Sequence, residues 1–289
     1  TERIASRCVC CGGSALDRSP AILMPGGANR VGGGTPGEIT PDWGLRTIAT
    51  GMAYPLCNSL QCRDCGLVFL DIRFDDAEMA ALYSGYRDEA YTAQRDRFEP
   101  CYRAHNESIL ASSVDMSGAE AFLQPHLPGR PRVLDWGGDS GKNTPFLNSA
   151  AGIDIFDISD RPLIEGVGRA GKDQLAPGRY DLIVLSHVLE HTPRPAEPIA
   201  EVGAAMGPKT VLYIEVPFEP LIAADPAARD LAAKKKHWHE HVNFFTEEAM
   251  RALLGGCGLD IVDLTIRPLP SHANFTQVMS VACRLAARR

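Results

Sequence analysis

The pattern of apolar and polar positions predicts several buried strands in the second half of the chain. An unbroken apolar run occupies 182–185 in "DLIVLS". Such a run is typical of a central parallel strand that is covered on both faces. The segment "TVLYIEVP", ended by Pro217, is interpreted as another such strand. Short runs at 67–70 and 133–134, and the segments "AGIDIFDISDRP" and "VMSVACRLA", predict further strands.

Amphipathic spacing predicts helices between these strands. The segment "DDAEMAALYSGYRDEAY" can be capped by Asp75 or Asp76, and its apolar residues follow at i, i+3, i+4 and i+7: Met79, Leu82, Tyr83 and Tyr86. Near the C-terminus Thr246 suits an N-cap, two glutamates follow it, and Gly255 and Gly256 can end the helix. Alternating strands and helices predict an α/β fold with a Rossmann-like, doubly wound core.

A glycine-rich turn follows the strand at 133–134 in "RPRVLDWGGDSGKNTPFL". Asp135 ends the strand, and Gly137, Gly138 and Gly141 come next. A strand, a glycine turn and a helix predict a cradle for a nucleotide-type ligand, because glycines allow close backbone approach and the helix start offers free N–H groups. About 20 residues later Asp157 lies near the end of the next strand, where an acid can accept both ribose hydroxyls. Asp154 is the alternative, but it lies nearer the start of that strand.

Composition places the chain among ordinary globular proteins, since 45% of its residues are apolar and 22% are charged. The net charge of −7 argues against a large nucleic-acid footprint, and the one basic run, "AAKKKH", is typical of a solvated helix end. No apolar stretch approaches the roughly 18 residues that span a bilayer, and no apolar segment marks a signal peptide. We therefore expect no membrane contact and a cytoplasmic location.

Two C-x-x-C pairs, Cys8 with Cys11 and Cys62 with Cys65, predict a four-cysteine zinc site. Glycine follows each pair and can take the positive φ that such turns often need. Cys10 is an alternative to Cys8 or Cys11, and inert or redox-active cysteines are the competing interpretation. With four thiolates and no open position, the Zn²⁺ is expected to be structural.

The segment 24–44, between the cysteine pairs, is rich in glycine and proline and is interpreted as an irregular loop rather than a core element. The predicted organisation has three parts. They are a zinc-binding module with this loop at 1–74, a helical linker or lid at 75–125, and a catalytic core at 126–289.

The motifs "VLDWGGDSG", "YDLIVLSHVLEH" and "LYIEVP", in this order, resemble class I S-adenosylmethionine-dependent methyltransferases over roughly 126–289. Asp139 stands where a second glycine is expected, and the G-x-G-x-x-G of dehydrogenases is absent. The resemblance implies S-adenosyl-L-methionine as cofactor. Its methionine end would be lined by Asp135 and the three glycines, and its ribose would be held by Asp157. Ser186 and His187 would lie beside the sulfonium and the substrate, and His191 is either catalytic or a structural cap.

The segment "HWHEHVNFF" has an aromatic-x-Glu-His motif before its two phenylalanines. Together with the cysteine module, it resembles the zinc-containing sugar C-methyltransferases of deoxysugar and antibiotic pathways. The resemblance assigns the general base to His241, assisted by Glu240. Trp238 stands where a tyrosine is expected, and Tyr83 or Tyr86 matches a tyrosine that follows the zinc module. A polar loop and a metal site that includes His237 and His239 are the alternatives.

Those enzymes carry an additional C-terminal domain that this sequence does not show, so the acceptor and the methylated atom stay open. A small molecule, sugar or sugar-like, is expected as the substrate. It could be a nucleotide-linked or polymer-attached sugar, and the methylated atom could be carbon or oxygen. A nucleic-acid-associated methyltransferase and a noncatalytic partner subunit are the rival hypotheses. The oligomeric state is not predicted.

Overall fold

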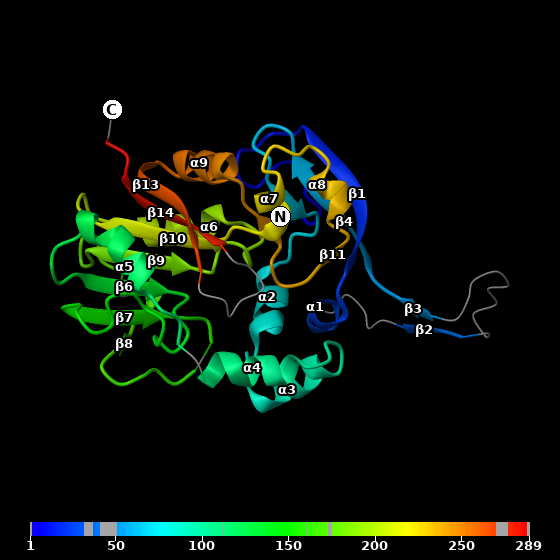
Figure 1. Cartoon of the computed structure of the whole chain (residues 1–289), viewed down its shortest axis with the longest axis horizontal. Helices are drawn as coiled ribbons and strands as arrows, with labels where there is room; N and C mark the ends of the chain where they lie inside the picture. The colour runs from blue at the N-terminus through cyan, green and yellow to red at the C-terminus, as the bar shows by residue number, and fades with distance from the viewer. Residues whose placement is uncertain are drawn as a thin grey trace.

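A computed structural model describes residues 2–31, 37–40, 51–111, 113–159, 161–172, 175–269 and 277–287, except the side chains of 51–53. Its described part contains a seven-stranded sheet, a five-stranded sheet and a two-stranded ribbon (Figure 1). The seven-stranded sheet confirms the predicted Rossmann-like α/β fold.

The strand order of the larger sheet is β13-β14-β10-β9-β6-β7-β8. Its strands are β6 (Arg132–Trp136), β7 (Gly152–Phe156), β8 (Gly168–Arg169), β9 (Leu182–Ser186), β10 (Val211–Pro217), β13 (Leu259–Pro268) and β14 (Gln277–Leu285). Strands β6 to β10 pair in parallel, whereas β14 is antiparallel to both β10 and β13. The carboxyl ends of the parallel strands therefore meet at one edge, where the predicted ligand residues lie.

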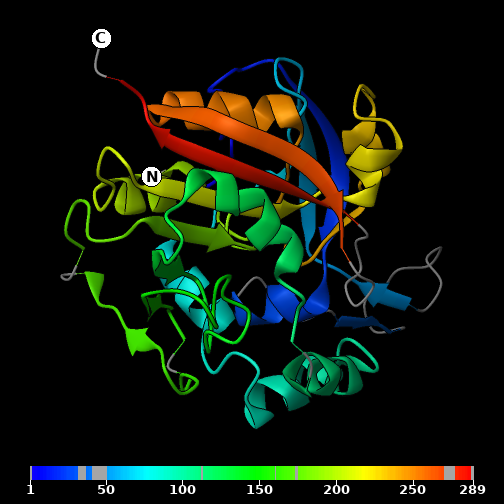
Figure 2. The same ribbon diagram turned by 60° about the vertical axis from the view of Figure 1, so that its left-hand side comes forward.

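Alternate residues of β9 face two different apolar clusters. Ile183 and Leu185 belong to a cluster with helices α6 (Ala196–Gly203) and α9 (Glu247–Gly256), while Leu182 and Val184 belong to one with α5 (Ser117–Leu123). Figure 2 shows α5 on the opposite side of β13 and β14 from α9. The unbroken apolar run is thus explained by a strand that is covered on both faces.

The smaller sheet has the order β11-β1-β4-β5-β12. Its strands are β1 (Leu16–Leu23), β4 (Leu56–Cys62), β5 (Val68–Leu70), β11 (His237–Trp238) and β12 (Asn243–Phe244). The two edge strands therefore come from the histidine-rich segment, which lies within the predicted catalytic core. Strands from the segment 1–74 therefore form one sheet with the two strands from 237–244.

The loop 239–242 joins the two edges of this five-stranded sheet. Five residue steps from Trp238 to Asn243 span at most about 18 Å. Four strand spacings in a flat sheet measure about 19 Å. The sheet must therefore curl, and the loop that carries His241 is held at both ends by it.

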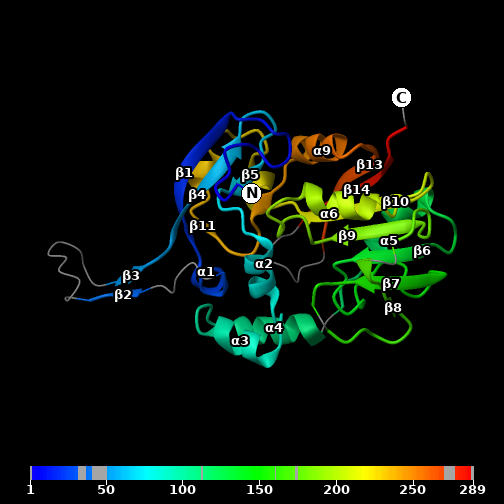
Figure 3. The same cartoon turned by 180° about the vertical axis from the view of Figure 1, so that it is seen from behind.

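Three helices follow the smaller sheet: α2 (Asp76–Tyr83), α3 (Glu89–Asp96) and α4 (Tyr102–Ala111). Asp75 caps α2 and forms a reciprocal capping box with Glu78, which confirms one of the two predicted caps. Seen from behind, α3 and α4 lie below α2 (Figure 3). The remaining elements are η2 (Gln124–His126), α7 (Pro220–Ala224), α8 (Leu231–Lys234) and the ribbon of β2 (Gly37–Ile39) and β3 (Gly51–Ala53).

Two local expectations are wrong. Residues 25–30 form helix α1 (Pro25–Arg30), with Ala28 fully buried, instead of an irregular loop. Proline at the first helical position explains this, since its missing N–H is not needed there. The parts of that segment at 32–36 and 41–44 lie outside the described residues. Helix α9 ends at Gly256, as predicted, and Gly258, at φ +73°, supplies the positive φ after it.

The second wrong expectation is the helix after the glycine turn. Residues 137–150 form successive turns with no α-helix. Pro145 cannot donate an interior helical hydrogen bond and disfavours helical backbone at Thr144. Phe146 has a φ of +62°, which is also not helical.

No helix in the described ranges is long and apolar enough to cross a membrane.

Candidate functional site

The four cysteines of the two C-x-x-C pairs come together. Each of Cys8, Cys11, Cys62 and Cys65 offers a sulfur, and these sulfurs lie within 4.8 Å of one another. The Sγ atoms of Cys8 and Cys65, and those of Cys11 and Cys62, are 3.5 Å apart. A tetrahedral zinc with Zn–S bonds of 2.3 Å requires a separation of about 3.8 Å, so the set fits zinc.

The two cysteine turns share one backbone design. The Gly12 N–H donates to the Cys8 carbonyl at 3.0 Å, and the Gly66 N–H donates to the Cys62 carbonyl at 2.9 Å. Gly12 and Gly66 have φ values of +74° and +76°, as the sequence predicted. Cys10 is buried but does not belong to the four-sulfur group.

The predicted cofactor residues lie at the carboxyl ends of β6 and β7. A Cβ on Gly137, which has a φ of +95°, would lie 2.6 Å from Val188 Cγ2. A Cβ on Gly138 would lie 2.7 Å from the Asp135 carboxylate, and one on Gly141, at φ +86°, would lie 3.2 Å from Ile155. Side chains at these positions would therefore crowd neighbouring side chains, and the positive φ of Gly137 and Gly141 suits glycine.

Asp157 is bonded to the glycine turn. Its Oδ2 accepts a hydrogen bond from the Asp139 N–H at 2.8 Å, and its Oδ1 accepts one from the Ser159 N–H at 2.7 Å. Each carboxylate oxygen retains a further lone pair for a ribose hydroxyl. Asp154 instead accepts from Tyr180 Oη at 2.7 Å and from Arg179 at 3.0 Å. The geometry favours Asp157 over its competitor.

Asp135 is 4% exposed and accepts a hydrogen bond from Thr144 Oγ1 at 2.6 Å. Burial raises the pKa of Asp135 to about 7, against the opposing effect of that hydrogen bond. Asp139, at the position of the missing glycine, takes a φ of +53° and forms an ion pair with Arg161 at 2.7 Å. Aspartate tolerates this backbone region better than most residues, which explains how the turn keeps its shape.

At the ends of β9 and β10, His187 lies between two buried carboxylates. Its Nδ1 is 3.2 Å from Glu190 Oε1, and its Nε2 is 3.4 Å from Glu215 Oε1. Burial lowers the pKa of His187, but the two carboxylates raise it to about 10. Ser186 Oγ donates to the same Glu215 oxygen at 3.3 Å. His187 is thus a cation at neutral pH, held by two acids.

His241 lies beside His191, with ring centroids 4.7 Å apart, and its Nδ1 is 2.6 Å from Glu219 Oε1. Because an ionised carboxylate only accepts, Nδ1 carries the proton and Nε2 carries the lone pair. His191 Nδ1 donates to the Glu240 carbonyl at 3.2 Å. Burial lowers the pKa of His191 to about 3, so this ring stays neutral. Potential ligand atoms of Glu190, His191 and His241 lie within 4.8 Å of one another.

Glu240, the residue expected to assist His241, has contacts from its carboxylate to helix α3. Its carboxylate accepts from Tyr91 Oη at 3.1 Å and is ion-paired with Arg95 of α3. The sequence analysis missed Glu219, which lies 22 positions before His241 and belongs to no local motif with it. The one available signal was a glutamate two residues after the predicted strand end at Pro217.

Tyr83 lies close to the histidines. Its ring centroid is 6.2 Å from that of His191 and 5.4 Å from that of Tyr86. Its hydroxyl is buried and has no hydrogen-bond partner in the described ranges. His237 and His239 pack edge to face 5.8 Å apart and join none of the potential metal groups found among the described residues.

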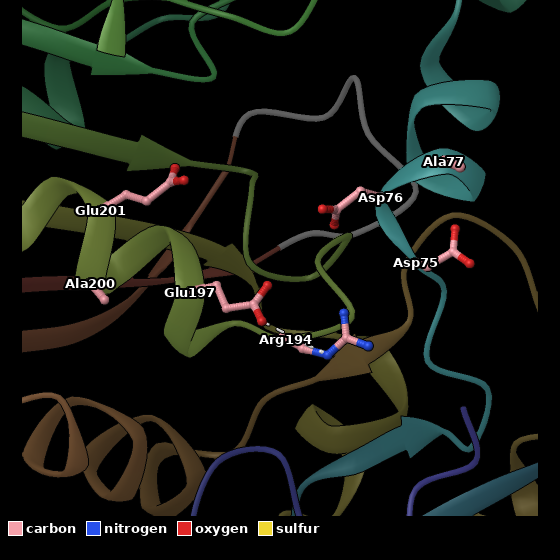
Figure 4. A pocket seen from close by; sticks show the side chains of 7 residues that line it. All are labelled: Asp75, Asp76, Ala77, Arg194, Glu197, Ala200 and Glu201. Atoms are coloured by element: carbon pink, nitrogen blue, oxygen red, sulfur yellow. Dashed lines mark ion pairs between the residues drawn. The ribbon is translucent and has the colours of Figure 1, made fainter. Parts of the chain in front are cut away.

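An open hollow of about 720 Å³ lies between the start of α2 and α6 (Figure 4). Its lining contains no predicted site residue: Asp75, Asp76, Ala77, Arg194, Glu197, Ala200 and Glu201. The candidate site is therefore assigned from the converging side chains at the strand ends and not from this hollow.

Comparisons with known proteins agree with this geometry. A family model described as a methyltransferase domain matches residues 102–264. The Burkholderia thailandensis 1,6-didemethyltoxoflavin-N1-methyltransferase, solved with 1,6-didemethyltoxoflavin and S-adenosylhomocysteine, is 18% identical, with a TM-score of 0.53 over 78% of this chain and 97% of that chain. At this identity, the likeness shows the fold.

Two further solved structures are more distant. The glycopeptide N-methyltransferase MtfA, complexed with sinefungin, is 14% identical, with a TM-score of 0.42 over 59% of this chain and 93% of its own. Magnesium protoporphyrin IX methyltransferase from Synechocystis PCC 6803, with bound S-adenosylhomocysteine, is 17% identical, with a TM-score of 0.39 over 66% of this chain and 87% of that chain. No curated protein matches the sequence.

Proposed function

Because this chain belongs to the methyltransferase-domain family, we propose that it transfers a methyl group from S-adenosylmethionine to a small-molecule acceptor, with His241 as general base. The observation that carries this proposal is the 2.6 Å contact between His241 Nδ1 and Glu219 Oε1. Glu219 lies two residues after the end of β10, at the carboxyl edge where ligands bind in doubly wound sheets.

The residues at the ends of β6 and β7 fit the cofactor. Asp157 would hold the ribose hydroxyls, and the turn of Gly137, Gly138 and Gly141 would lie against the amino-acid end, with Asp135 beneath it. Ser186 and His187 would border the reacting centre. When bound, S-adenosylmethionine supplies an electrophilic methyl group on a sulfonium ion.

The base acts through Nε2 of His241. Nε2 accepts the proton from the acceptor, either from a hydroxyl or from the carbon beside a ketone. Glu219 holds the ring by its Nδ1–H and stabilises the imidazolium that forms. His191 is neutral and packed edge to face against this ring, so it limits the orientation of His241 without adding a competing charge.

A sugar or sugar-like acceptor is the finer part of the proposal. It is supported by the resemblance of the cysteine module and the Trp-x-Glu-His motif to the zinc-containing sugar methyltransferases. The buried hydroxyl of Tyr83 beside His191 has no hydrogen-bond partner among the described residues and offers a polar contact to such a molecule. Zn²⁺ on the four cysteines is proposed to be structural. The acceptor would be free, nucleotide-linked or polymer-attached.

The test is a mass-spectrometric screen. Nucleotide-linked sugars and their keto derivatives are incubated with the protein and S-adenosylmethionine, and the products are examined for the gain of one methyl group. Methylation by the wild type, lost in His241→Ala, supports the proposal. Methylation that survives in His241→Ala contradicts the base assignment and leaves the transfer itself supported.

A further inference from the structure

The short connection between α2 and α3 contains Arg87, whose backbone and side chain are both unusual. Its φ is +64°, in the left-handed region that non-glycine residues seldom adopt. Arginine gains nothing locally from this conformation. Strained positions of this kind cluster at ligand sites, where the rest of the structure holds them in place.

The guanidinium group of Arg87 has few partners for its five N–H donors. Within the described ranges it makes one hydrogen bond, from Nη2 to Tyr86 Oη at 3.2 Å, and stacks 4.9 Å from the centre of the Tyr86 ring. Its Nε is buried and has no partner. A partly buried guanidinium with unused donors is suited to a carboxylate or phosphate, which it can bind through two parallel hydrogen bonds.

Several contacts place Arg87 against the candidate site. The Tyr86 ring packs on Tyr83, which in turn packs on His191. On the other side, Lys142 Nζ of the glycine-turn segment donates to the Ile109 carbonyl of α4 at 2.7 Å. The helices that follow Arg87 therefore touch the cofactor cradle directly.

The charges agree with this placement. Burial lowers the pKa of Arg87, while Tyr86, Tyr102 and Asp139 act to raise it. Asp139 belongs to the glycine turn. Burial lowers the pKa of Lys142, and both Arg161 and Arg87 lower it further. Arg87 is therefore a cation within electrostatic range of the cradle.

We propose that Arg87, held by Tyr86, binds a carboxylate or phosphate anion at the mouth of the candidate site. The inference rests on the proposed function. Two molecules could supply this anion: the α-carboxylate of the cofactor, or an acidic group of the acceptor. The chemistry of recognition is the same in both cases.

The experiment uses calorimetry with S-adenosylhomocysteine and with 5′-methylthioadenosine, which lacks the amino-acid carboxylate. Inorganic pyrophosphate, titrated into the protein saturated with S-adenosylhomocysteine, serves as the probe for an acceptor anion. The variants are Arg87→Ala and Arg87→Lys. Arg97→Ala, an exposed arginine at the end of α3, is the matched control. Thermal unfolding of each variant checks that it folds.

If the anion belongs to the cofactor, Arg87→Ala weakens S-adenosylhomocysteine binding by about tenfold or more and leaves methylthioadenosine unchanged. If it belongs to the acceptor, both nucleosides bind as in the wild type and pyrophosphate binding is lost. Arg87→Lys should retain part of whichever affinity Arg87→Ala loses, because lysine keeps the positive charge but lacks the planar guanidinium group.

Unchanged binding of all three probes in a folded Arg87→Ala overturns the inference and leaves the proposed function standing. If Arg87→Ala does not fold, Arg87→Lys decides the question, and binding equal to the wild type again overturns the inference. A wild-type protein that binds neither nucleoside overturns the proposed function and this inference together.

Discussion

His241 Nδ1 lies 2.6 Å from Glu219 Oε1, and this contact joins the segment after β10 to the loop that crosses the smaller sheet. The carboxylate determines which ring nitrogen carries the proton, and so which one can accept a proton from an acceptor. The position of Glu219 is as important to the proposed chemistry as that of His241.

Removal of either partner should slow methyl transfer to different extents. We expect His241→Ala to lower kcat by roughly 10²–10⁴-fold, the range for loss of a general base. Glu219→Gln should lower kcat by about tenfold or more, because the amide can hold the ring but cannot stabilise its cation. Affinity for S-adenosylhomocysteine should stay within a few-fold in both. A Glu219→Gln enzyme with wild-type kcat would show that His241 works without its carboxylate.

The ribose assignment can be tested by comparing two aspartates from the same strand region. Asp157→Asn should weaken S-adenosylhomocysteine binding by about tenfold or more, because a charged acceptor of two hydroxyl hydrogen bonds is lost. Asp154→Asn should bind as the wild type does, since Asp154 is turned toward Arg179 and Tyr180. Calorimetry measures both, and the reverse ranking would transfer the ribose site to Asp154.

One zinc per chain is expected by elemental analysis, held by the four clustered sulfurs. Cys11→Ser and Cys62→Ser should each lose the metal and lower the melting temperature, because three thiolates bind Zn²⁺ less tightly than four. Cys57→Ala is the matched control, since Cys57 is buried in the same sheet but lies outside the cluster. Stoichiometric zinc in Cys62→Ser would exclude the proposed ligand set.

Asn243 links the smaller sheet to the turn that carries Glu190 and His191. It pairs with Phe69 in the sheet, and its Nδ2 donates to the carbonyls of Leu189 at 2.9 Å and Thr192 at 2.7 Å. Asn243→Leu removes both donations, and the Leu189 carbonyl then keeps only its hydrogen bond from the Thr192 N–H at 3.3 Å.

We therefore expect Asn243→Leu to lower the free energy of unfolding by about 1–3 kcal/mol, measured by urea titration. Asn148→Ala, at an exposed position, should leave the unfolding free energy within about 0.5 kcal/mol of the wild type. Equal stability of the two variants would show that the turn does not depend on Asn243.

The sequence predicted those features that depend on neighbouring residues. The paired cysteine turns, the Asp75 and Thr246 caps and the strands that are apolar on both faces all follow from short-range spacing. The absence of a helix after Gly141 is also signalled locally, by Pro145, although the strand and glycine turn had predicted a helix there.

Features that depend on distant contacts could not be predicted in this way. β11 and β12 are two residues long, too short for any periodic signal, and they pair with strands more than 170 positions away. Glu240 follows the family motif next to His241, yet Arg95 and Tyr91 from α3 take its carboxylate. In the folded structure it is Glu219, 22 positions earlier in the sequence, whose carboxylate contacts His241.

His187 gives a pH dependence whose sign follows from its raised pKa. Burial opposes the charge, but Glu190 and Glu215 raise the folded-state pKa to about 10, against about 6.5 in an unfolded chain. A raised folded-state pKa stabilises the protein fully below the unfolded value, and this contribution is lost as the pH rises through the folded value. The unfolding free energy of the wild type should therefore decrease between pH 6.5 and 10.

Urea titrations across that pH window should show a smaller decrease for His187→Gln than for the wild type. His105 is an exposed histidine on α4, so His105→Gln should follow the wild type. If the unfolding free energy of His187→Gln changes with pH as steeply as that of the wild type, His187 is not held as a cation between the two carboxylates.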